Sequence, residues 1–253
     1  MKAIVTGASS GIGKDIAKYL ASKNIDLVLV ARRENELNKL KEELSNTKVD
    51  IQIYPCDLKN LDECKKIPQL FNDVDILINN AGFGDAGEFI KTNLDKELDM
   101  IDVNIKALHI LFKEYLKLFV SKNSGHILNV ASVAGFQPGP KMATYYATKA
   151  YVLNLSEAVS YELKKSKSKV SISVLCPGPV ATEFNKVANV KFKIKEMSSS
   201  KVAKIGIDKM FKNKVLILPG FKTKLGVFFE RFVPRKLTNY IVCRAQEKKQ
   251  MGK

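Results

Sequence analysis

The stretch Lys2-Ala3-Ile4-Val5-Thr6-Gly7-Ala8-Ser9-Ser10-Gly11-Ile12-Gly13 joins a short apolar run to a turn with three glycines, and residues 14–21 then follow a helical pattern. Glycine permits the tight turn and a close approach of the backbone to a phosphate. The first N–H groups of the following helix would face that phosphate. Strand, glycine-rich turn and helix in this order predict a dinucleotide-binding unit rather than a plain turn, although the spacing Gly-x-x-x-Gly-x-Gly is not the commoner Gly-x-Gly-x-x-Gly.

Apolar strand-like runs alternate with helical stretches along most of the chain. The expected strands are residues 2–6, 26–31, 49–54, 75–79, 125–131, 169–175 and 215–218. The expected helices between them are residues 14–21, 34–44, 61–71, 97–120 and 150–163. This alternation predicts an α/β fold of the Rossmann type: a doubly wound parallel sheet of about seven strands in a single domain, with helices on both faces.

Polar or charged residues stand at or just past the ends of five expected strands. These residues are Thr6, Arg32, Asp57, Asn80 and Ser132. Ligands bind such sheets at the carboxyl ends of the strands. The sequence therefore predicts one composite site along this edge.

The second expected strand ends in Ala31-Arg32-Arg33. A protein that binds NAD would often place an acidic residue here, to hold the ribose 2′-hydroxyl. Two guanidinium groups instead suit a 2′-phosphate, which they can bind bidentately. The adjacent arginines favour NADP(H) over NAD(H), and a pair of surface arginines is the alternative.

Tyr145 and Lys149 are four residues apart at the start of a helical stretch. On a helix this spacing puts them on one face, one turn apart. A neighbouring ammonium favours the phenolate, so we expect Lys149 to lower the pKa of Tyr145 from its usual value of about 10. Such a tyrosine can exchange a proton with an alcohol or a ketone. Taken alone, Tyr-x-x-x-Lys is a weak motif, and a packed tyrosine beside an exposed lysine is the commoner arrangement.

These features together resemble the short-chain dehydrogenase/reductase family. The matching motifs, in chain order, are Thr6-Gly7-x-x-x-Gly11-x-Gly13, Asp57, Asn79-Asn80-Ala81-Gly82, Asn104, Ser132, Tyr145-x-x-x-Lys149 and Pro177-Gly178. The resemblance is to single-domain members with a Ser-Tyr-Lys-Asn tetrad, and it covers residues 1 to about 220. It implies an NADP-dependent oxidoreductase that transfers a hydride between NADP(H) and a carbonyl compound or secondary alcohol.

The resemblance implies a role for each residue of the tetrad. Tyr145 would be the general acid or base, and Lys149 would lower its pKa and hydrogen-bond the nicotinamide ribose. Ser132 would bind the substrate oxygen and stabilise its developing charge. Asn104 would hold a water that connects Lys149 to solvent. Tyr146 is not the candidate acid, because no lysine stands four residues after it.

The resemblance also implies the contacts to the cofactor. The pyrophosphate would lie on Gly7, Ser9, Ser10, Gly11, Ile12 and Gly13. The adenosine half would contact Asp57, Leu58, Asn80, Ala81 and Gly82, with Arg32 and Arg33 at the 2′-phosphate. The nicotinamide half would contact Tyr145, Lys149, Pro177, Gly178, Val180 and Thr182.

The composition and charge of the chain argue against several other classes of protein. The 253 residues are 45% hydrophobic, enough for one well-packed core. Four cysteines without metal-binding spacing predict reduced thiols, no metal site and a cytoplasmic location. We expect no signal peptide and no membrane-spanning segment. The net charge of +16 comes mainly from scattered lysines, and arginines and aromatic residues are not gathered on one element, so we expect no nucleic-acid partner.

Residues 221–253 lie beyond the catalytic domain expected at residues 1–220. Leu225, Phe228, Phe229 and Phe232 recur at helical spacing before Pro234, and basic residues flank them. Packing on the domain, at the substrate cleft or against a second subunit is the favoured interpretation of this extension. Contact with an anionic membrane surface is the less favoured one. By resemblance, we expect a homodimer or homotetramer.

The substrate is constrained only in its class. Candidates for an apolar pocket are Phe83, Phe136, Met142, Phe184 and Phe192, and core packing is the alternative for each. We expect the lysine-rich residues 183–200 to form a flap over the site. Two other functions stay open: a nicotinamide-nucleotide-binding redox sensor without turnover, and a protein of the membrane surface.

Overall fold

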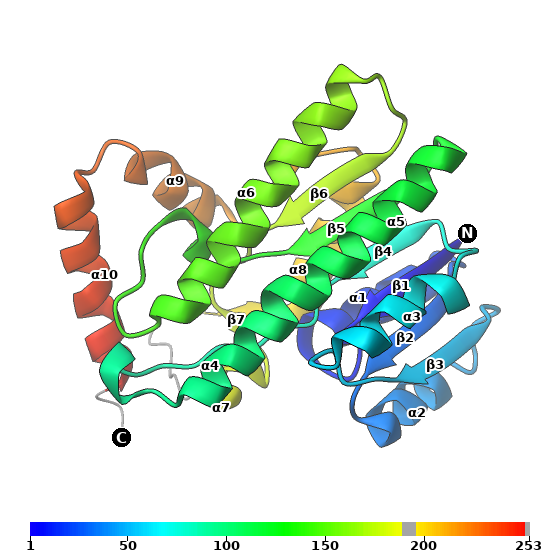
Figure 1. The fold of residues 1–253 in the computed structure, drawn as a ribbon, viewed down its shortest axis with the longest axis horizontal. Coiled ribbons are helices and arrows are strands. Elements are labelled where there is room, and N and C mark those ends of the chain that lie inside the picture. The colour runs from blue at the N-terminus through cyan, green and yellow to red at the C-terminus, as the bar shows by residue number, and fades with distance from the viewer. Residues whose placement is uncertain (189–195, 251–253) are drawn as a thin grey trace.

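The computed structural model describes residues 1–188 and 196–250 and confirms the predicted parallel sheet of seven strands (Figure 1). In spatial order the strands are β3 (Ile51–Pro55), β2 (Asp26–Ala31), β1 (Lys2–Thr6), β4 (Ile76–Asn79), β5 (His126–Val130), β6 (Ser171–Leu175) and β9 (Leu216–Ile217). The order reverses between β1 and β4, and ligands of doubly wound sheets bind at such a switch point.

Helices cover both faces of the sheet because its strands are apolar on both sides. One face packs against α1 (Gly11–Ala21), α2 (Glu34–Glu43) and α8 (Ser199–Met210). The other packs against α3 (Leu61–Leu70), α5 (Leu108–Lys122) and α6 (Ala143–Lys165). The strands therefore lie between two apolar cores, and the central strands are almost wholly buried, whereas the edge strand β3 is only half-buried.

The helical stretch expected at residues 97–120 is not uniform. It comprises α4 (Leu94–Ile101), a π-helical segment η2 (Asp102–Ala107) and α5. A π turn widens the helix and often occurs at functional sites. Asn104 lies inside this segment and is buried.

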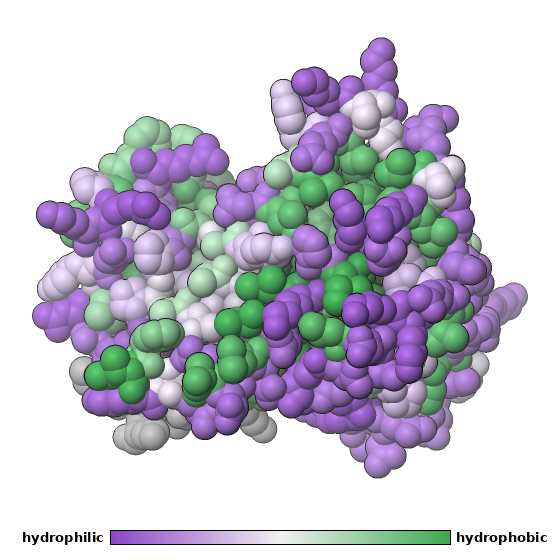
Figure 2. Space-filling model, in the orientation of Figure 1, coloured by the Kyte–Doolittle hydropathy of each residue, from purple (hydrophilic) through white to green (hydrophobic). Residues whose placement is uncertain are grey.

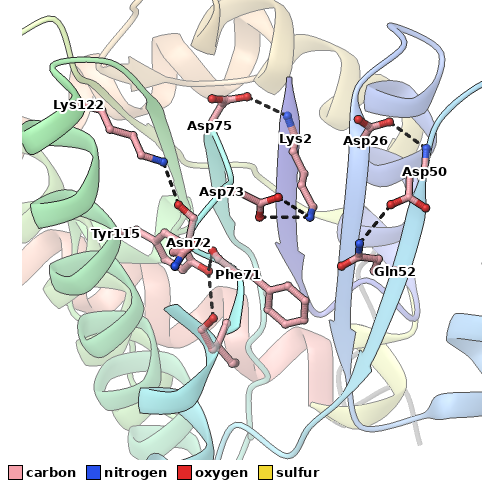
Figure 3. A network of polar contacts seen from close by, with 11 residues as sticks. Lys2, Asp26, Asp50, Gln52, Phe71, Asn72, Asp73, Asp75, Tyr115 and Lys122 are labelled. Atoms are coloured by element: carbon pink, nitrogen blue, oxygen red, sulfur yellow. Dashed lines mark hydrogen bonds and ion pairs between the residues drawn. The ribbon is translucent and has the colours of Figure 1, made fainter. Parts of the chain in front are cut away.

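The amino ends of the strands are fixed by a separate polar network (Figure 3). The backbone N–H of Lys2 donates to the carboxylate of Asp75 at 2.9 Å, and the hydroxyl of Tyr115 donates to the carbonyl of Phe71 at 3.0 Å. The backbone N–H of Asp50 donates to Asp26 at 2.8 Å. At the amino ends of the strands these polar groups are thus engaged in hydrogen bonds within the protein. The candidate site residues lie at the opposite edge of the sheet.

Short elements and the C-terminal extension surround the carboxyl edge. The short elements are η1 (Phe89–Lys91), η3 (Val133–Phe136), β7 (Val180–Ala181), α7 (Phe184–Val187) and β8 (Met197–Ser198). The extension forms α9 (Phe221–Glu230) and α10 (Arg235–Gln250), which stand apart from the sheet in Figure 1. Residues 189–195 of the expected flap lie outside the described residues.

Candidate active site

The glycine turn after β1 presents an uncapped helix end. Ser10 is the N-cap residue of α1, but its side chain makes no capping hydrogen bond, and the first turn of α1 contains no acidic residue. The first N–H groups of this helix therefore remain available to an anion. Gly7 and Gly11 have φ values of +66° and +54°, which favour glycine. This cradle fits the pyrophosphate of a dinucleotide.

Thr6 ties the end of β1 to the residues that follow β4. Its hydroxyl donates to the carbonyl of Ile78 and accepts the backbone N–H groups of Asn80 and Ala81, at 3.0 and 3.1 Å. The amide of Asn80 returns a hydrogen bond to the carbonyl of Thr6 at 2.9 Å. A Cβ on Gly7 would lie only 2.8 Å from the Asn80 amide nitrogen. Thr6 and Asn80, which the sequence places at one composite site, therefore lie together, and Gly7 packs closely against Asn80 and Ala81.

The side chain of Arg33 reaches the glycine turn that follows β1. Its guanidinium donates to the hydroxyl of Ser9 and forms an ion pair with Glu183 at 3.0 Å. Arg32 is exposed, and no ion pair of Arg32 occurs within the described part of the chain. At the next strand end, Asp57 accepts the backbone N–H of Lys59 at 3.1 Å, and Leu58 is buried. Asp57 thus serves as a turn residue and still lies at the predicted edge.

Tyr145 and Lys149 occupy the first two turns of α6 and are both buried. The Lys149 Nζ lies 5.9 Å from the centroid of the Tyr145 ring and donates to the carbonyl of Val130 at 2.9 Å. Val130 ends β5, so the ammonium is held at the carboxyl edge of the sheet. Among residues 1–188 and 196–250, no carboxylate pairs with Lys149. A buried cation without a counter-charge is typical of functional sites.

The pKa of Tyr145 does not follow the sequence-based expectation. Burial raises the pKa of the Tyr145 phenol, and the side chain of Ser132 only partly opposes that effect. Burial lowers the pKa of Lys149 to about 8. We expected Lys149 to lower the pKa of its neighbour, but burial, which disfavours the charged phenolate, raises the pKa of Tyr145 instead. Tyr145 is therefore protonated at neutral pH.

Asn104 connects the π-helical segment to both sides of the site. Its side-chain oxygen accepts the N–H of Phe83 at 3.1 Å, and its amide donates to the Phe83 carbonyl and to the hydroxyl of Thr148. Thr148 stands directly before Lys149. A Cβ on Gly82 would lie 2.9 Å from the Asn104 oxygen and 3.4 Å from the Lys149 nitrogen. Residues 82, 104 and 149 therefore converge, whereas the family resemblance implied Gly82 only as a contact to the adenosine half of the cofactor.

Ser132 and the loop after β6 complete the edge. The Ser132 hydroxyl accepts the N–H of Ala134 at 3.1 Å, which leaves its own proton for a second hydrogen bond. The carbonyl of Pro177 accepts the N–H of Val133 at 3.1 Å. Gly178 and Thr182 are half-buried, and a Cβ on Gly11 would lie 3.1 Å from the Thr182 methyl group. Val180 is buried.

An apolar cluster surrounds Tyr145, but it contains only part of the expected pocket. Met142, Phe83 and Phe184 pack in one group with Tyr145, and the rings of Phe184 and Tyr145 are 5.2 Å apart. Phe136 instead packs in the core between the sheet, α5 and α6. Phe136 is partly buried against that core and is not part of the cluster around Tyr145, so core packing is the better interpretation for Phe136. Phe192 lies outside the described residues.

Sequence reasoning missed several residues of the site. Thr148 orients Asn104, Glu183 pairs with Arg33, and Gln246 in α10 donates to the hydroxyl of Tyr146 at 2.7 Å. Thr148 lies between the two motif residues and is buried, but a threonine in a helix gives no signal of its own. Glu183 could have been noticed, because an acid directly after Thr182 is uncommon in so basic a segment.

Comparison with known proteins identifies the family. A family model described as short chain dehydrogenase matches residues 1–191. An uncharacterised oxidoreductase of Staphylococcus epidermidis is 38% identical over 183 residues, which are 71% of this chain and 78% of that protein. The chain therefore belongs to the short-chain dehydrogenase family of oxidoreductases.

Solved structures agree with this assignment. A short-chain dehydrogenase from Sphingobium yanoikuyae in complex with NADPH has a TM-score of 0.84, 28% identity and 94% coverage of each chain. A bulky-bulky ketone specific alcohol dehydrogenase from Comamonas testosteroni has a TM-score of 0.79, 28% identity and 91% coverage of each chain. A family member from Burkholderia phymatum in complex with NAD has a TM-score of 0.84 at 23% identity and covers 94% of this chain and 95% of its own, and it supports the fold alone.

Proposed function

We propose that the protein transfers a hydride between NADP(H) and a carbonyl compound or secondary alcohol, with Tyr145 as general acid and base. The observation that supports this most strongly is the buried pair of Tyr145 and Lys149 at the carboxyl edge of β5. Lys149 holds a positive charge with no carboxylate partner among the described residues, next to a protonated phenol. Such a pair is costly for stability and useful for proton transfer.

The proposed proton transfer uses three side chains. The protonated Tyr145 donates its proton to the substrate oxygen, and Ser132 hydrogen-bonds the same oxygen. Lys149 then stabilises the phenolate that forms. The side chain of Asn104 is already committed to Phe83 and Thr148, so we assign the holding of a water to the backbone of the π-helical segment. When bound, the nicotinamide supplies or accepts the hydride.

The choice of NADP(H) over NAD(H) is supported by charge. Arg32 and Arg33 follow β2, and Ser9 in the glycine turn already contacts the Arg33 guanidinium. Together they offer donors where a ribose 2′-phosphate would lie. The NADPH complex of the relative from Sphingobium yanoikuyae agrees with this choice.

The proposed substrate class is a hydrophobic ketone or its alcohol. Phe83, Met142 and Phe184 surround Tyr145 with apolar surface. Apolar walls with a few convergent polar groups are typical of small-molecule sites. The relative from Comamonas testosteroni, named for bulky ketones, supports the same class.

The alternative of a redox sensor without turnover is less well supported. A sensor needs the nucleotide site but not a buried proton donor beside a buried ammonium. Both Tyr145 and Lys149 are present and lie together. A cytoplasmic location and a homo-oligomer remain predictions from the sequence.

The test is to follow oxidation of NADPH and of NADH by the purified protein with a series of bulky aromatic and alicyclic ketones. We expect turnover with at least one ketone, at a higher kcat/KM for NADPH than for NADH. Equal use of both nucleotides would contradict the assignment of Arg32 and Arg33. Tight binding of NADPH with no turnover of any ketone would support the sensor instead.

A further inference from the structure

The helix α9 exposes aromatic side chains that the fold does not use. Of its residues, only Val227 is buried. Phe221, Phe228, Phe229 and Phe232, in α9 and just after it, are each more than half exposed. The ring of Phe228 lies 5.5 Å from that of Phe229 and 5.6 Å from that of Phe232. Figure 2 shows apolar surface over this helix, interrupted by hydrophilic side chains. A group of exposed aromatic rings of this kind marks an interaction surface.

A strongly basic cavity adjoins the same helix. It has a volume of about 570 Å³ and lies between the end of α8, β9 and α9. Its cationic lining residues are Lys209, Lys212, Lys214, Lys224 and Arg231. Leu216, Leu218 and Phe228 give it apolar walls.

The positive charge of this cavity is not neutralised from within. Among the described lining residues the single acid is Asp208, which accepts a hydrogen bond from Tyr19 at 2.6 Å and pairs with Lys23 at 3.7 Å. Burial lowers the pKa of Lys209, and the charges of Lys224 and Lys214 lower it further. The lysines therefore repel one another, and an anion in the cavity would relieve that repulsion.

Either a second copy of the chain or a lipid bilayer could cover the aromatic rings of α9. The two differ in whether their charge complements that of the basic cavity. A second copy seated on α9 across a twofold axis would bring two of these basic cavities together, which like-charge repulsion opposes. A bilayer with anionic lipids would instead complement both features: its phosphates attract the lysines, and its interface accepts aromatic rings. The described residues include no helix that is long and apolar enough to cross a bilayer, so the contact would lie at the surface.

We propose that α9 and the basic cavity form a binding site for the surface of an anionic lipid bilayer. Lipid phosphates lie in the cavity, and Phe228, Phe229 and Phe232 enter the interfacial region. The site borders the proposed cleft, because a Cβ on Gly178 would lie 3.3 Å from the hydroxyl of Thr223 in α9. A hydrophobic ketone dissolved in the bilayer would then reach Tyr145 from the side on which the protein docks.

The test is sedimentation with vesicles at low salt, which needs no enzyme activity. One set of vesicles contains phosphatidylcholine alone, and the other contains about one third phosphatidylglycerol. We expect binding to the anionic vesicles only, with release at high salt. Each lysine near such a surface contributes about fivefold to binding. The double variant Lys209→Gln/Lys224→Gln should therefore bind roughly thirtyfold more weakly, and Phe228→Ser/Phe232→Ser about tenfold more weakly.

The matched control is Lys41→Gln/Lys48→Gln. These lysines are exposed near the opposite edge of the sheet, and neither forms an ion pair within the described residues. This variant has the same net charge as the cavity variant and should bind anionic vesicles nearly as well as the parent protein. Circular dichroism checks that every variant is folded.

Four results would overturn the proposal. The first is no preference for anionic over neutral vesicles. The second is an equal loss in the cavity variant and the control, which would show an effect of net charge alone. The third is a protein that binds inorganic phosphate through Lys209 and Lys224 but does not bind vesicles, which would assign the cavity to a free anion. The fourth is a phenylalanine variant that differs from the parent only in its oligomeric state, which would assign the aromatic rings to a second copy of the chain.

Discussion

Among single residues, Lys149 serves the proposed reaction but destabilises the folded protein. The residue is 5% exposed, and its side-chain hydrogen bond goes to a neutral carbonyl, that of Val130. Burying a cation without a counter-charge is destabilising, which is why burial lowers the pKa of Lys149 to about 8. The proposed reaction needs this charge beside Tyr145, which explains why a lysine that destabilises the fold stands at this position.

Replacing Lys149 should therefore stabilise the nucleotide-free protein while removing its activity. We expect Lys149→Met to raise the free energy of unfolding at neutral pH by roughly 2 kcal/mol. The pKa is about 8 in the folded state against 10.5 in the unfolded state. Below about pH 8 both states are protonated and the cost of burial is complete. Above it the folded state loses its proton first, so the parent protein recovers stability as the pH rises.

Urea unfolding near pH 7 and near pH 10 measures this difference. The advantage of Lys149→Met should be clear at the lower pH and small at the higher one. A variant less stable than the parent at both values would show that the hydrogen bond to Val130 and the packing of the lysine stem outweigh the buried charge.

At the scale of elements, the nucleotide edge is shaped by contacts between segments far apart in the chain. Arg33 follows β2 and Glu183 follows β7, and their side chains meet at 3.0 Å. A 2′-phosphate on Arg33 would compete with the Glu183 carboxylate, because both are anions on one guanidinium. Glu183 is therefore expected to weaken binding of NADPH.

Removing that competitor should favour NADPH alone. An exposed ion pair is worth up to about 1 kcal/mol, so Glu183→Gln should bind NADPH up to about fivefold more tightly at low salt. Binding of NADH, which lacks the 2′-phosphate, should change little. Nicotinamide fluorescence titrations measure both. Glu114→Gln, which breaks the exposed pair with Lys117, is the control and should change neither. An equal gain for both nucleotides would mean that Glu183 acts on something other than the 2′-phosphate.

The first turn of α1 gives a second test at this scale. A Cβ on Gly13 would collide with the Asn80 amide and the Gly7 carbonyl, whereas a Cβ on Gly226 in α9 would meet nothing within 4 Å. Gly13→Ala should lower the free energy of unfolding by about 3 kcal/mol or more and abolish nucleotide binding. Gly226→Ala should raise it by up to about 1 kcal/mol, because alanine favours the helix. Thermal unfolding compares them, and equal effects would contradict the account of the turn.

Local pattern predicted most elements, and long-range contacts account for what it missed. The alternation of strands and helices identified the sheet, because the central strands are mostly apolar on both faces and the helices on one. The π-helical segment at residues 102–107 could not be predicted, since the apolar spacing continues through it. The motifs located Tyr145, Lys149, Ser132 and Asn104. They could not show that burial raises the pKa of Tyr145, because burial depends on Met142, Phe184 and their neighbours.

At the scale of the whole molecule, the surface is basic and one group of helices is available for assembly. The net charge is +16. On the face of the sheet opposite α1, Tyr151 of α6 hydrogen-bonds His109 of α5 at 2.7 Å, and both lie at the surface. By resemblance we expect subunits to pair through these two helices.

Light scattering tests this assembly directly. The parent protein should have the mass of a dimer or tetramer at micromolar concentration, and Tyr151→Arg should shift it toward the monomer because it places charge in the interface. Tyr240→Arg, a change of the same kind on α10, should leave the mass unchanged. A parent protein that is monomeric throughout would contradict the prediction.

Tyr145 is the proposed proton donor, and its neighbour Tyr146 offers the matched control. Tyr146 lies next to it in α6, is partly buried and hydrogen-bonds Gln246. The measurement is kcat/KM for NADPH-dependent reduction of a ketone substrate by Tyr145→Phe and by Tyr146→Phe, with NADPH binding measured alongside. We expect Tyr145→Phe to lose at least about a hundredfold in kcat/KM while still binding NADPH, because general acids contribute on that order. We expect Tyr146→Phe to stay within about threefold of the parent. Comparable activity in the two variants would contradict the account.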